Sequence, residues 1–280
     1  MPAPIPTANS VYLDHHASTP LLPEVQSAME PWLGTGFGNP SNILHEYGRD
    51  ARTGIKWARE QVASLIRAEA NEIIFTSGAT EANNLVMKGV PPLLDNPGLL
   101  ISTLEHESVA RPAASIAGSG RSLHYVPADE HGRIQPEQVE KILKEYPVGL
   151  VSVIHVQGEI GTINPIREIA DIAHANDCLV HTDAAQSVGK IPVDVNQLGI
   201  DYLTIAAHKM YGPKGIGALF VREGAPLEPI LHGAGHERGL RPGTENVPYL
   251  IGFGEASRIA GEDLKQERSR QEELRDALYQ

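Results

Sequence analysis

A lysine placed directly after an apolar run is the residue best suited to covalent chemistry in this sequence. Lys209 follows the run DYLTIAA, stands next to His208 and precedes a Gly-Pro loop. Partial loss of solvent would lower the pKa of this lysine and make its amine a nucleophile that forms a Schiff base with a carbonyl compound. Taken alone, AAHKMYGPKG fits an ordinary surface lysine equally well.

Two further segments end in groups that suit the same chemistry. Asp183 lies in CLVHTDAA, and a carboxylate buried there needs a cation such as a protonated ring nitrogen, unless it caps the next helix. His106 ends GLLISTLEH, where its ring could cover a planar ligand and transfer a proton. A hydrogen-bonded structural histidine is the more common case at such a position.

A fourth segment, SGATEANN, has the composition of a turn that opens a helix. Ala79 and Thr80 would lie at the helix N-terminus, where unpaired amides and the helix dipole favour a phosphate. The simpler interpretation is a capped helix, with Thr80 or Ser77 satisfying those amides. The four segments taken together predict one ligand site.

The elements that must position these residues are short β-rich runs alternating with helical patterns. A helix is predicted from Arg52 onward, because Ile55, Ala58 and Val62 recur at helical spacing. Residues 165–176 and 255–280 are also predicted to be helical, and residues 12–42 to be mostly loop. The seven β-rich runs are EIIFTSG, GLLISTLEH, SLHYVPAD, GLVSVIHV, CLVHTDAA, DYLTIAAHK and GALFVRE.

This alternation predicts an α/β fold with a largely parallel seven-stranded sheet covered by helices on both faces. Ligands of such sheets collect beyond the carboxyl ends of the strands, where all four segments would lie. The 280 residues suffice for one large domain.

Composition and charge argue against several other classes of function. The formal net charge is -12, and no stretch gathers Lys or Arg into a stripe, so nucleic acid is not an expected partner. No apolar run approaches the roughly 20 residues that span a bilayer, and MPAPIPTANS lacks the features of a signal peptide. We therefore expect a cytoplasmic protein without a membrane partner. The sequence contains no H-E-x-x-H and no paired C-x-x-C motif, so a dedicated metal site is not expected.

Motifs spread over almost the whole chain resemble one known family. They are YLDHHASTP, FGNPSN, FTSGATEANN, EHESV, HVQGEIGTINPI, HTDAAQSVGKIPVD, HKMYGPKGIGALFVR and GAGHERGLRPGTEN. The resemblance is to the class V, fold-type I pyridoxal-phosphate enzymes, and within them to the cysteine desulfurases that mobilise sulfur for iron–sulfur clusters. It implies an N-terminal segment at 1–14, a pyridoxal-phosphate-binding large domain at 15–258 and a helix at 259–280 that leads toward a C-terminal small domain.

The resemblance also implies a cofactor and a role for each site residue. Lys209 would attach pyridoxal 5'-phosphate covalently, Asp183 would pair with its pyridine nitrogen, and His106 would stack on the ring and assist proton transfer. The implied substrate is L-cysteine, which would give alanine and a persulfide, and the implied partners are a second copy of the chain and a sulfur-acceptor or scaffold protein. Ala79, Thr80 and His208 would hold the phosphate of the cofactor, and Gln186 would contact its ring hydroxyl. Thr244 would reach the cofactor phosphate in the neighbouring subunit.

The sequence departs from the usual family pattern in three respects. Gly158 replaces the second Asn of HVNNE, which contacts the cofactor, and Ala206 replaces a Ser whose hydroxyl binds the phosphate. The nucleophilic cysteine and the substrate-binding arginine of the family belong to the small domain, and Cys178 is expected to be a buried hydrophobe rather than a substitute. Two alternatives therefore stay open: a pyridoxal-phosphate lyase or aminotransferase, and a catalytically silent partner of a full-length desulfurase.

Overall fold

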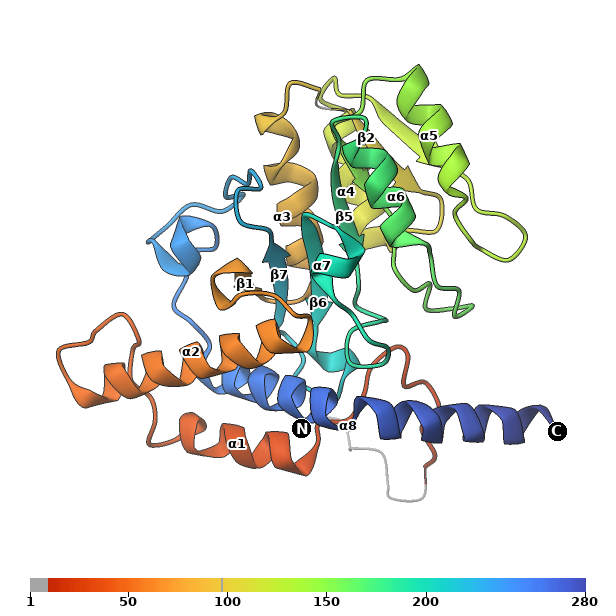
Figure 1. Ribbon diagram of the computed structural model, residues 1–280. Helices are drawn as coiled ribbons and strands as arrows, with labels where there is room; N and C mark the ends of the chain where they lie inside the picture. Colours follow the sequence, from red (N-terminus) through yellow and green to blue (C-terminus); the bar gives the residue numbers. More distant parts are fainter. Residues whose placement is uncertain (1–9, 97) are drawn as a thin grey trace.

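The centre of the molecule is a twisted seven-stranded sheet with helices packed on both faces (Figure 1). The computed structural model of the chain describes residues 10–96 and 98–280. Each of the seven β-rich runs holds one strand, so the predicted strands are confirmed. They are β1 (Ile73–Thr76), β2 (Leu99–Ser102), β3 (Leu123–Val126), β4 (Leu150–Ser152), β5 (Leu179–Asp183), β6 (Tyr202–Ala206) and β7 (Gly217–Val221).

The strand order is β1-β7-β6-β5-β4-β2-β3, and the sheet is largely parallel as predicted. Only β7 runs against its neighbours β1 and β6, while the other neighbouring pairs are parallel. The strands other than the edge strand β3 are almost wholly buried, because helices cover both faces. The carboxyl ends of β1, β2, β4, β5 and β6 therefore share one edge, which is where the predicted site residues lie.

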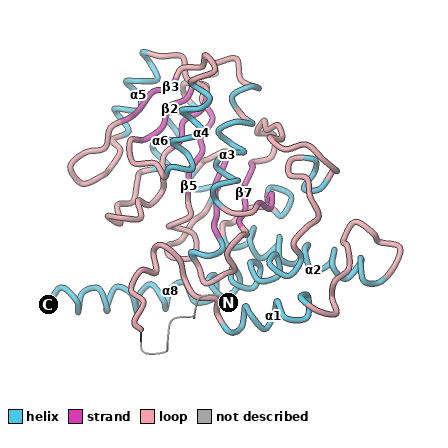
Figure 2. The backbone as a smooth tube through the Cα atoms, turned by 180° about the vertical axis from the view of Figure 1, so that it is seen from behind, coloured by secondary structure: helices cyan, strands magenta, loops and turns pink. Residues whose placement is uncertain are grey.

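The helices form two layers that bury the two faces of the sheet. Helices α3 and α4 pack against one face, and α2, α5, α6 and α8 against the other. Helices α1, α2 and α8 lie together at one end of the molecule, as both Figure 1 and Figure 2 show. The helix bounds are α1 (Pro23–Leu33), α2 (Glu46–Leu65), α3 (Ala79–Gly89), α4 (Glu107–Ala117), α5 (Pro136–Glu145), α6 (Ile166–His174), α7 (Val195–Leu198) and α8 (Val247–Tyr279).

Two expectations about the N-terminal region need correction. Helix α1 occupies residues predicted to be mostly loop; Pro23 opens it, and Val25 and Met29 bury one side of it. Helix α2 begins six residues before Arg52, at Glu46, because the ring of His45 caps it by accepting a hydrogen bond from the Gly48 amide at 3.2 Å.

The last helix is half buried and half exposed. Its buried residues run from Val247 to Ser257, and Leu274, Leu278 and Tyr279 near its end are exposed. Both tube and ribbon views show this end projecting past the rest of the molecule (Figures 1 and 2). Among the described helices, none is long and apolar enough to cross a membrane.

Candidate active site

A cavity of about 940 Å³ opens at the edge of the sheet where the parallel strands end. The loops after β1, β2, β4, β5 and β6 supply most of its wall, and the segment 16–18 closes one side. The structure thus brings together every predicted site residue except Thr244, which is exposed on the loop before α8. The residues gathered here are Ala79, Thr80, His106, Asp183, Gln186, His208 and Lys209.

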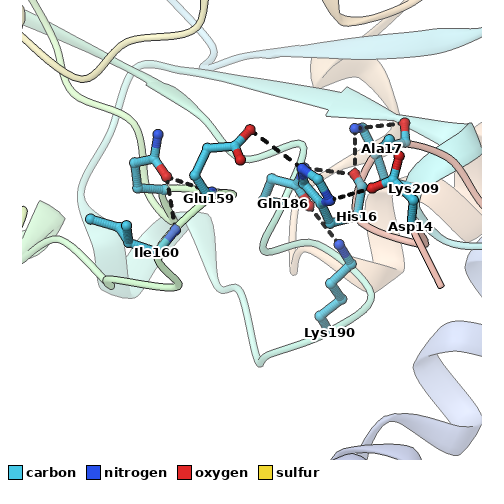
Figure 3. Close-up of polar contacts among 9 residues, drawn as sticks. Asp14, His16, Ala17, Glu159, Ile160, Gln186, Lys190 and Lys209 are labelled. Atoms are coloured by element: carbon cyan, nitrogen blue, oxygen red, sulfur yellow. Dashed lines mark hydrogen bonds and ion pairs between the residues drawn. The ribbon is translucent and has the colours of Figure 1, made fainter.

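Lys209 lies at the end of a short 3₁₀ turn that follows β6 directly. Its Nζ donates to the backbone carbonyls of His16 at 2.6 Å and Ala17 at 3.0 Å (Figure 3). Burial lowers the pKa of Lys209, and the nearby carboxylates of Asp183 and Asp14 oppose that shift. The amine is therefore held in place at the cavity wall and is easier to deprotonate than a surface lysine.

Asp183 ends β5 and is buried beneath the same cavity, with an exposed fraction of 4%. Its Oδ2 accepts from Nδ2 of Asn83 at 2.8 Å, and its Oδ1 accepts from the Ala185 amide at 2.9 Å. Burial raises the pKa of Asp183, while these hydrogen bonds and the charges of His106 and Lys209 lower it. The carboxylate both caps the following turn and faces a cavity where a cation would stabilise its charge.

His106 is the N-cap of α4 as well as part of the cavity wall. Its Nδ1 accepts from the Ser108 amide at 3.1 Å and lies 2.7 Å from the Ser108 hydroxyl. This hydrogen bonding assigns the ring proton to Nε2. The structural interpretation of His106 is confirmed, because its Nδ1 caps α4, and its role in proton transfer stays a prediction.

Asn83 links these two residues and is not among the site residues predicted from the sequence. Its Nδ2 donates at 2.8 Å to both the Ser108 hydroxyl and Asp183 Oδ2. Asn83 is fully buried, and its Oδ1 has no hydrogen-bond partner among the described residues. A polar side chain on the inner face of a predicted helix was the available signal.

The opposite end of the cavity is suited to an anion. Helix α3 starts at Ala79, and its N-cap Gly78 has φ 145°, a backbone conformation that favours glycine, with no side chain capping the first amides. The capped-helix interpretation of SGATEANN is thus not what the structure shows. Burial and the charges of Lys209 and Lys214 lower the pKa of His208, which also lines this end.

Gln186 is held by residues on both sides (Figure 3). Its Oε1 accepts from Nζ of Lys190 at 2.6 Å, and its Nε2 donates to the carbonyl of His16 at 3.0 Å. A Cβ on Gly158 would lie 3.0 Å from Nε2 of Gln186, so the glycine leaves room for this amide. Burial lowers the pKa of Lys190 to about 8.

Cys178 lies just before β5 and does not line the cavity. Its exposed fraction is 2%, its Sγ donates to the Val148 carbonyl at 3.1 Å, and burial raises its pKa to about 11. The prediction of a buried hydrophobe is confirmed. A low-pKa, accessible thiolate would be needed for nucleophilic chemistry.

A second cavity lies outside the candidate site, and the described residues add no metal site to it. A second cavity of about 940 Å³ lies between α2 and the loop 234–245, and it contains none of the residues predicted for the site. Within the described residues, no group of three or more His, Cys, Asp or Glu side chains is placed to hold a metal ion.

Comparisons with known proteins show which family and which solved folds the chain is similar to. The aminotransferase class-V family model matches residues 11–280. The chain is 47% identical to cysteine desulfurase IscS of Dictyoglomus turgidum over 268 residues, which cover 95% of this chain and 68% of the relative. A solved NifS-like protein superposes with a TM-score of 0.92 at 37% identity, covering 96% of this chain and 74% of the other.

A further solved structure, described as SspA in complex with cysteine, has a TM-score of 0.84 at 40% identity and covers 90% of this chain and 72% of the other. These relatives therefore share with this chain both a high sequence identity over nearly its whole length and the same fold. The chain belongs to the class-V aminotransferase family and, within it, to the cysteine desulfurases, which depend on pyridoxal phosphate.

Proposed function

We propose that this chain binds pyridoxal 5'-phosphate in the cavity at the carboxyl ends of the strands. The donor set fits that molecule: uncapped amides at the start of α3 and the ring of His208 suit the phosphate, and the buried carboxylate of Asp183 suits a protonated ring nitrogen. Lys209 lines the same cavity and has a lowered pKa. The observation that carries the proposal is the meeting of these three chemistries in one cavity.

Each residue would do a separate part of the work. Lys209 would attach the cofactor through its amine and later accept or return a proton, because burial lowers its pKa and makes the amine easier to deprotonate. Asp183, oriented by Asn83 and Ala185, would stabilise positive charge on the ring nitrogen. His106 would cover the ring and move a proton through Nε2. Pyridoxal phosphate, when bound, supplies an electron sink for the amino acid substrate.

The remaining contacts would secure the cofactor. Ala79 and Thr80 would hold its phosphate with His208, and Gln186 would contact its ring hydroxyl through the amide that Lys190 and the His16 carbonyl orient. With Ala206 and Gly158 in place of side chains that bind the cofactor in the family pattern, we expect weaker binding than that pattern would give.

We further propose that the reaction is removal of sulfur from L-cysteine, giving alanine and a persulfide for iron–sulfur cluster assembly in the cytoplasm. The names of the relatives and the cysteine complex of one structural neighbour support this substrate. Cys178 is buried with a raised pKa, so the thiol that receives the sulfur would be a different one. A sulfur-acceptor or scaffold protein would then act as partner.

The test is a turnover assay with a supplied thiol. The protein is loaded with pyridoxal phosphate and incubated with L-cysteine and dithiothreitol, and alanine is measured for the native chain and for Lys209→Ala. Alanine from the native chain alone would support desulfuration. Alanine from Lys209→Ala at the native rate would contradict the role of Lys209.

A second candidate function is that of a catalytically silent partner of a full-length desulfurase. The burial and raised pKa of Cys178 favour it, because this thiol is not available to accept sulfur. In that case the native chain would bind the cofactor and yield no alanine by itself. A lyase or aminotransferase would instead consume L-cysteine and yield a product other than alanine.

We also propose a homodimer whose partner completes each site through Thr244. Thr244 is exposed on its loop, and that loop is joined to the segment 37–47 by a contact of 3.3 Å between His236 Nε2 and Ser41 Oγ. The same segment carries an apolar patch on the surface, consisting of Phe37, Ile43, Leu44 and Tyr47. Burial of this patch against a second copy would bring Thr244 to the neighbouring subunit.

A further inference from the structure

Glu105 has a buried carboxyl group at the wall of the same cavity, directly before His106 in the sequence. Its Oε1 accepts from the Ser102 hydroxyl at 2.5 Å and from the Ile154 amide at 2.6 Å. Ser102 ends β2 and Ile154 follows β4, so this single oxygen joins the ends of two neighbouring strands.

The other oxygen of Glu105 is in a different situation. Oε2 is buried and has no hydrogen-bond partner among the described residues. The carboxylate of Asp183 acts on Glu105 through its charge and disfavours a negative charge there. A buried carboxylate that lacks a cation is costly, and the usual outcome is that the group keeps its proton.

We propose that Glu105 is a positioning residue that works as a neutral acid, carrying its proton on Oε2 while Oε1 holds the ends of β2 and β4 together. It would fix the loop that carries His106 without placing a second negative charge beside Asp183. Asp183 would then be the buried carboxylate available to a cationic ring nitrogen. The benefit for cofactor binding rests on the proposed function, whereas the protonated state of Glu105 does not.

The pH dependence of stability follows from the same state. Burial raises the pKa of Glu105 to about 8, from 4.5 for an ordinary glutamate. Between these values the folded protein holds one proton more than the unfolded chain, so this group makes the free energy of unfolding fall as pH rises toward about 8. Asp183 on β5 acts on Glu105 through its charge, His106 follows Glu105 in the sequence, and both are present in the variants compared below.

The direct test is infrared spectroscopy of the native protein and of Glu105→Gln without cofactor. A protonated carboxyl has a carbonyl band that a carboxylate lacks, so the native protein should show this band at neutral pH and lose it above about pH 8. Glu105→Gln should lose the band that belongs to Glu105, while any band from Asp183, whose pKa burial also raises, is common to both proteins. Glu107→Gln is the matched control, because Glu107 is exposed and paired with Arg111 at 3.2 Å, which lowers its pKa; this variant should keep the band.

A titration of the native protein keeps the test independent of any variant. Carbon-13 NMR of the glutamate carboxyl carbons should show one resonance that remains protonated at neutral pH. If all glutamate resonances report ionised carboxylates at neutral pH, and Glu105→Gln removes no infrared band, the proposal is overturned.

The positioning role has its own readout. Glu105→Gln keeps a neutral group that can accept from Ser102 and Ile154, so its yield of borohydride-reduced pyridoxal-phosphate adduct at neutral pH should match that of the native chain. Glu105→Leu leaves both donors unpaired and should lower that yield. Equal yields from Gln and Leu variants would show that Glu105 does not position the site, while absence of adduct in the native chain would instead count against the proposed function.

Discussion

At the residue scale, Asn83 holds together two groups of the candidate site with one amide. Both hydrogens of Nδ2 are used, one by Asp183 and one by Ser108, which in turn contacts His106. The side chain is fully buried. Removal of it would leave a buried carboxylate oxygen without its donor, and such unpaired groups are costly.

Asn83→Ala is therefore expected to lower the free energy of unfolding by about 2–3 kcal/mol and to weaken pyridoxal-phosphate binding. Urea denaturation and a cofactor titration measure the two effects. Asn84→Ala is the matched control, since the neighbouring Nδ2 bonds only to the Thr80 carbonyl at 2.9 Å. An equal loss of stability and of cofactor binding in Asn83→Ala and Asn84→Ala would contradict a special role for Asn83.

Residues at strand ends could be predicted from sequence, and residues that support them could not. Lys209, Asp183 and His106 each follow an apolar run, and the edge of a parallel sheet gathers such positions. Glu105 resembles an ordinary turn carboxylate in the sequence. Its burial depends on the Ile154 amide, 49 residues away along the chain, and no local pattern reports such a contact.

At the element scale, the loop 233–246 is fixed by ion pairs to two other elements. Arg59 of α2 makes a bidentate contact with Glu237, with distances of 2.7 and 2.6 Å, and Glu237 Oε2 also accepts from the Phe75 amide at 2.9 Å. Arg241 binds Glu81 at the start of α3 at 2.8 Å. Glu237 is buried and has φ 46°, so the ion pair holds a strained backbone in place.

Arg59→Met should destabilise the fold by about 3–5 kcal/mol, because it leaves the buried carboxylate of Glu237 without its cation. The double variant with Glu237→Gln should lose less than the sum of the two single changes. Chemical denaturation of all four proteins measures this coupling. Arg111→Met removes an exposed pair and should cause no measurable loss; additive effects at residues 59 and 237 would contradict the coupling.

The strands were easier to predict than their directions. Buried runs rich in Val, Ile and Leu marked all seven strands, but an apolar run reports burial on both faces and not direction. The antiparallel position of β7 between β1 and β6 follows from the short return after Lys209. Helix α1 was missed because its proline and short apolar stripe resemble a loop, and its stability comes from packing against α8.

At the scale of the whole molecule, segment 37–47 leaves several large apolar side chains exposed in one chain. Phe37 and Leu44 are 76% and 89% exposed, and the rings of Phe37 and Tyr47 stack with centroids 5.5 Å apart. Exposed apolar groups gathered in this way mark interaction surfaces. The proposed second copy would cover them.

Leu44→Lys should convert the proposed dimer to a monomer, because it places a charge in the apolar contact, and sedimentation velocity would show the change. Folding should be unaffected, since the side chain is already exposed. Leu278→Lys is the matched control: Leu278 is 87% exposed on α8, and its variant should remain a dimer. A native chain that sediments as a monomer would remove the role proposed for Thr244.

The central claim is that Lys209 attaches pyridoxal phosphate in the cavity at the strand ends. The most direct measurement is borohydride reduction of the protein with added pyridoxal phosphate, followed by peptide mapping of the adduct. We expect the adduct on Lys209, its loss in Lys209→Ala, and its retention in Lys214→Ala, which changes another lysine of the same cavity. No adduct in the native chain, or an adduct that persists in Lys209→Ala, would contradict the account.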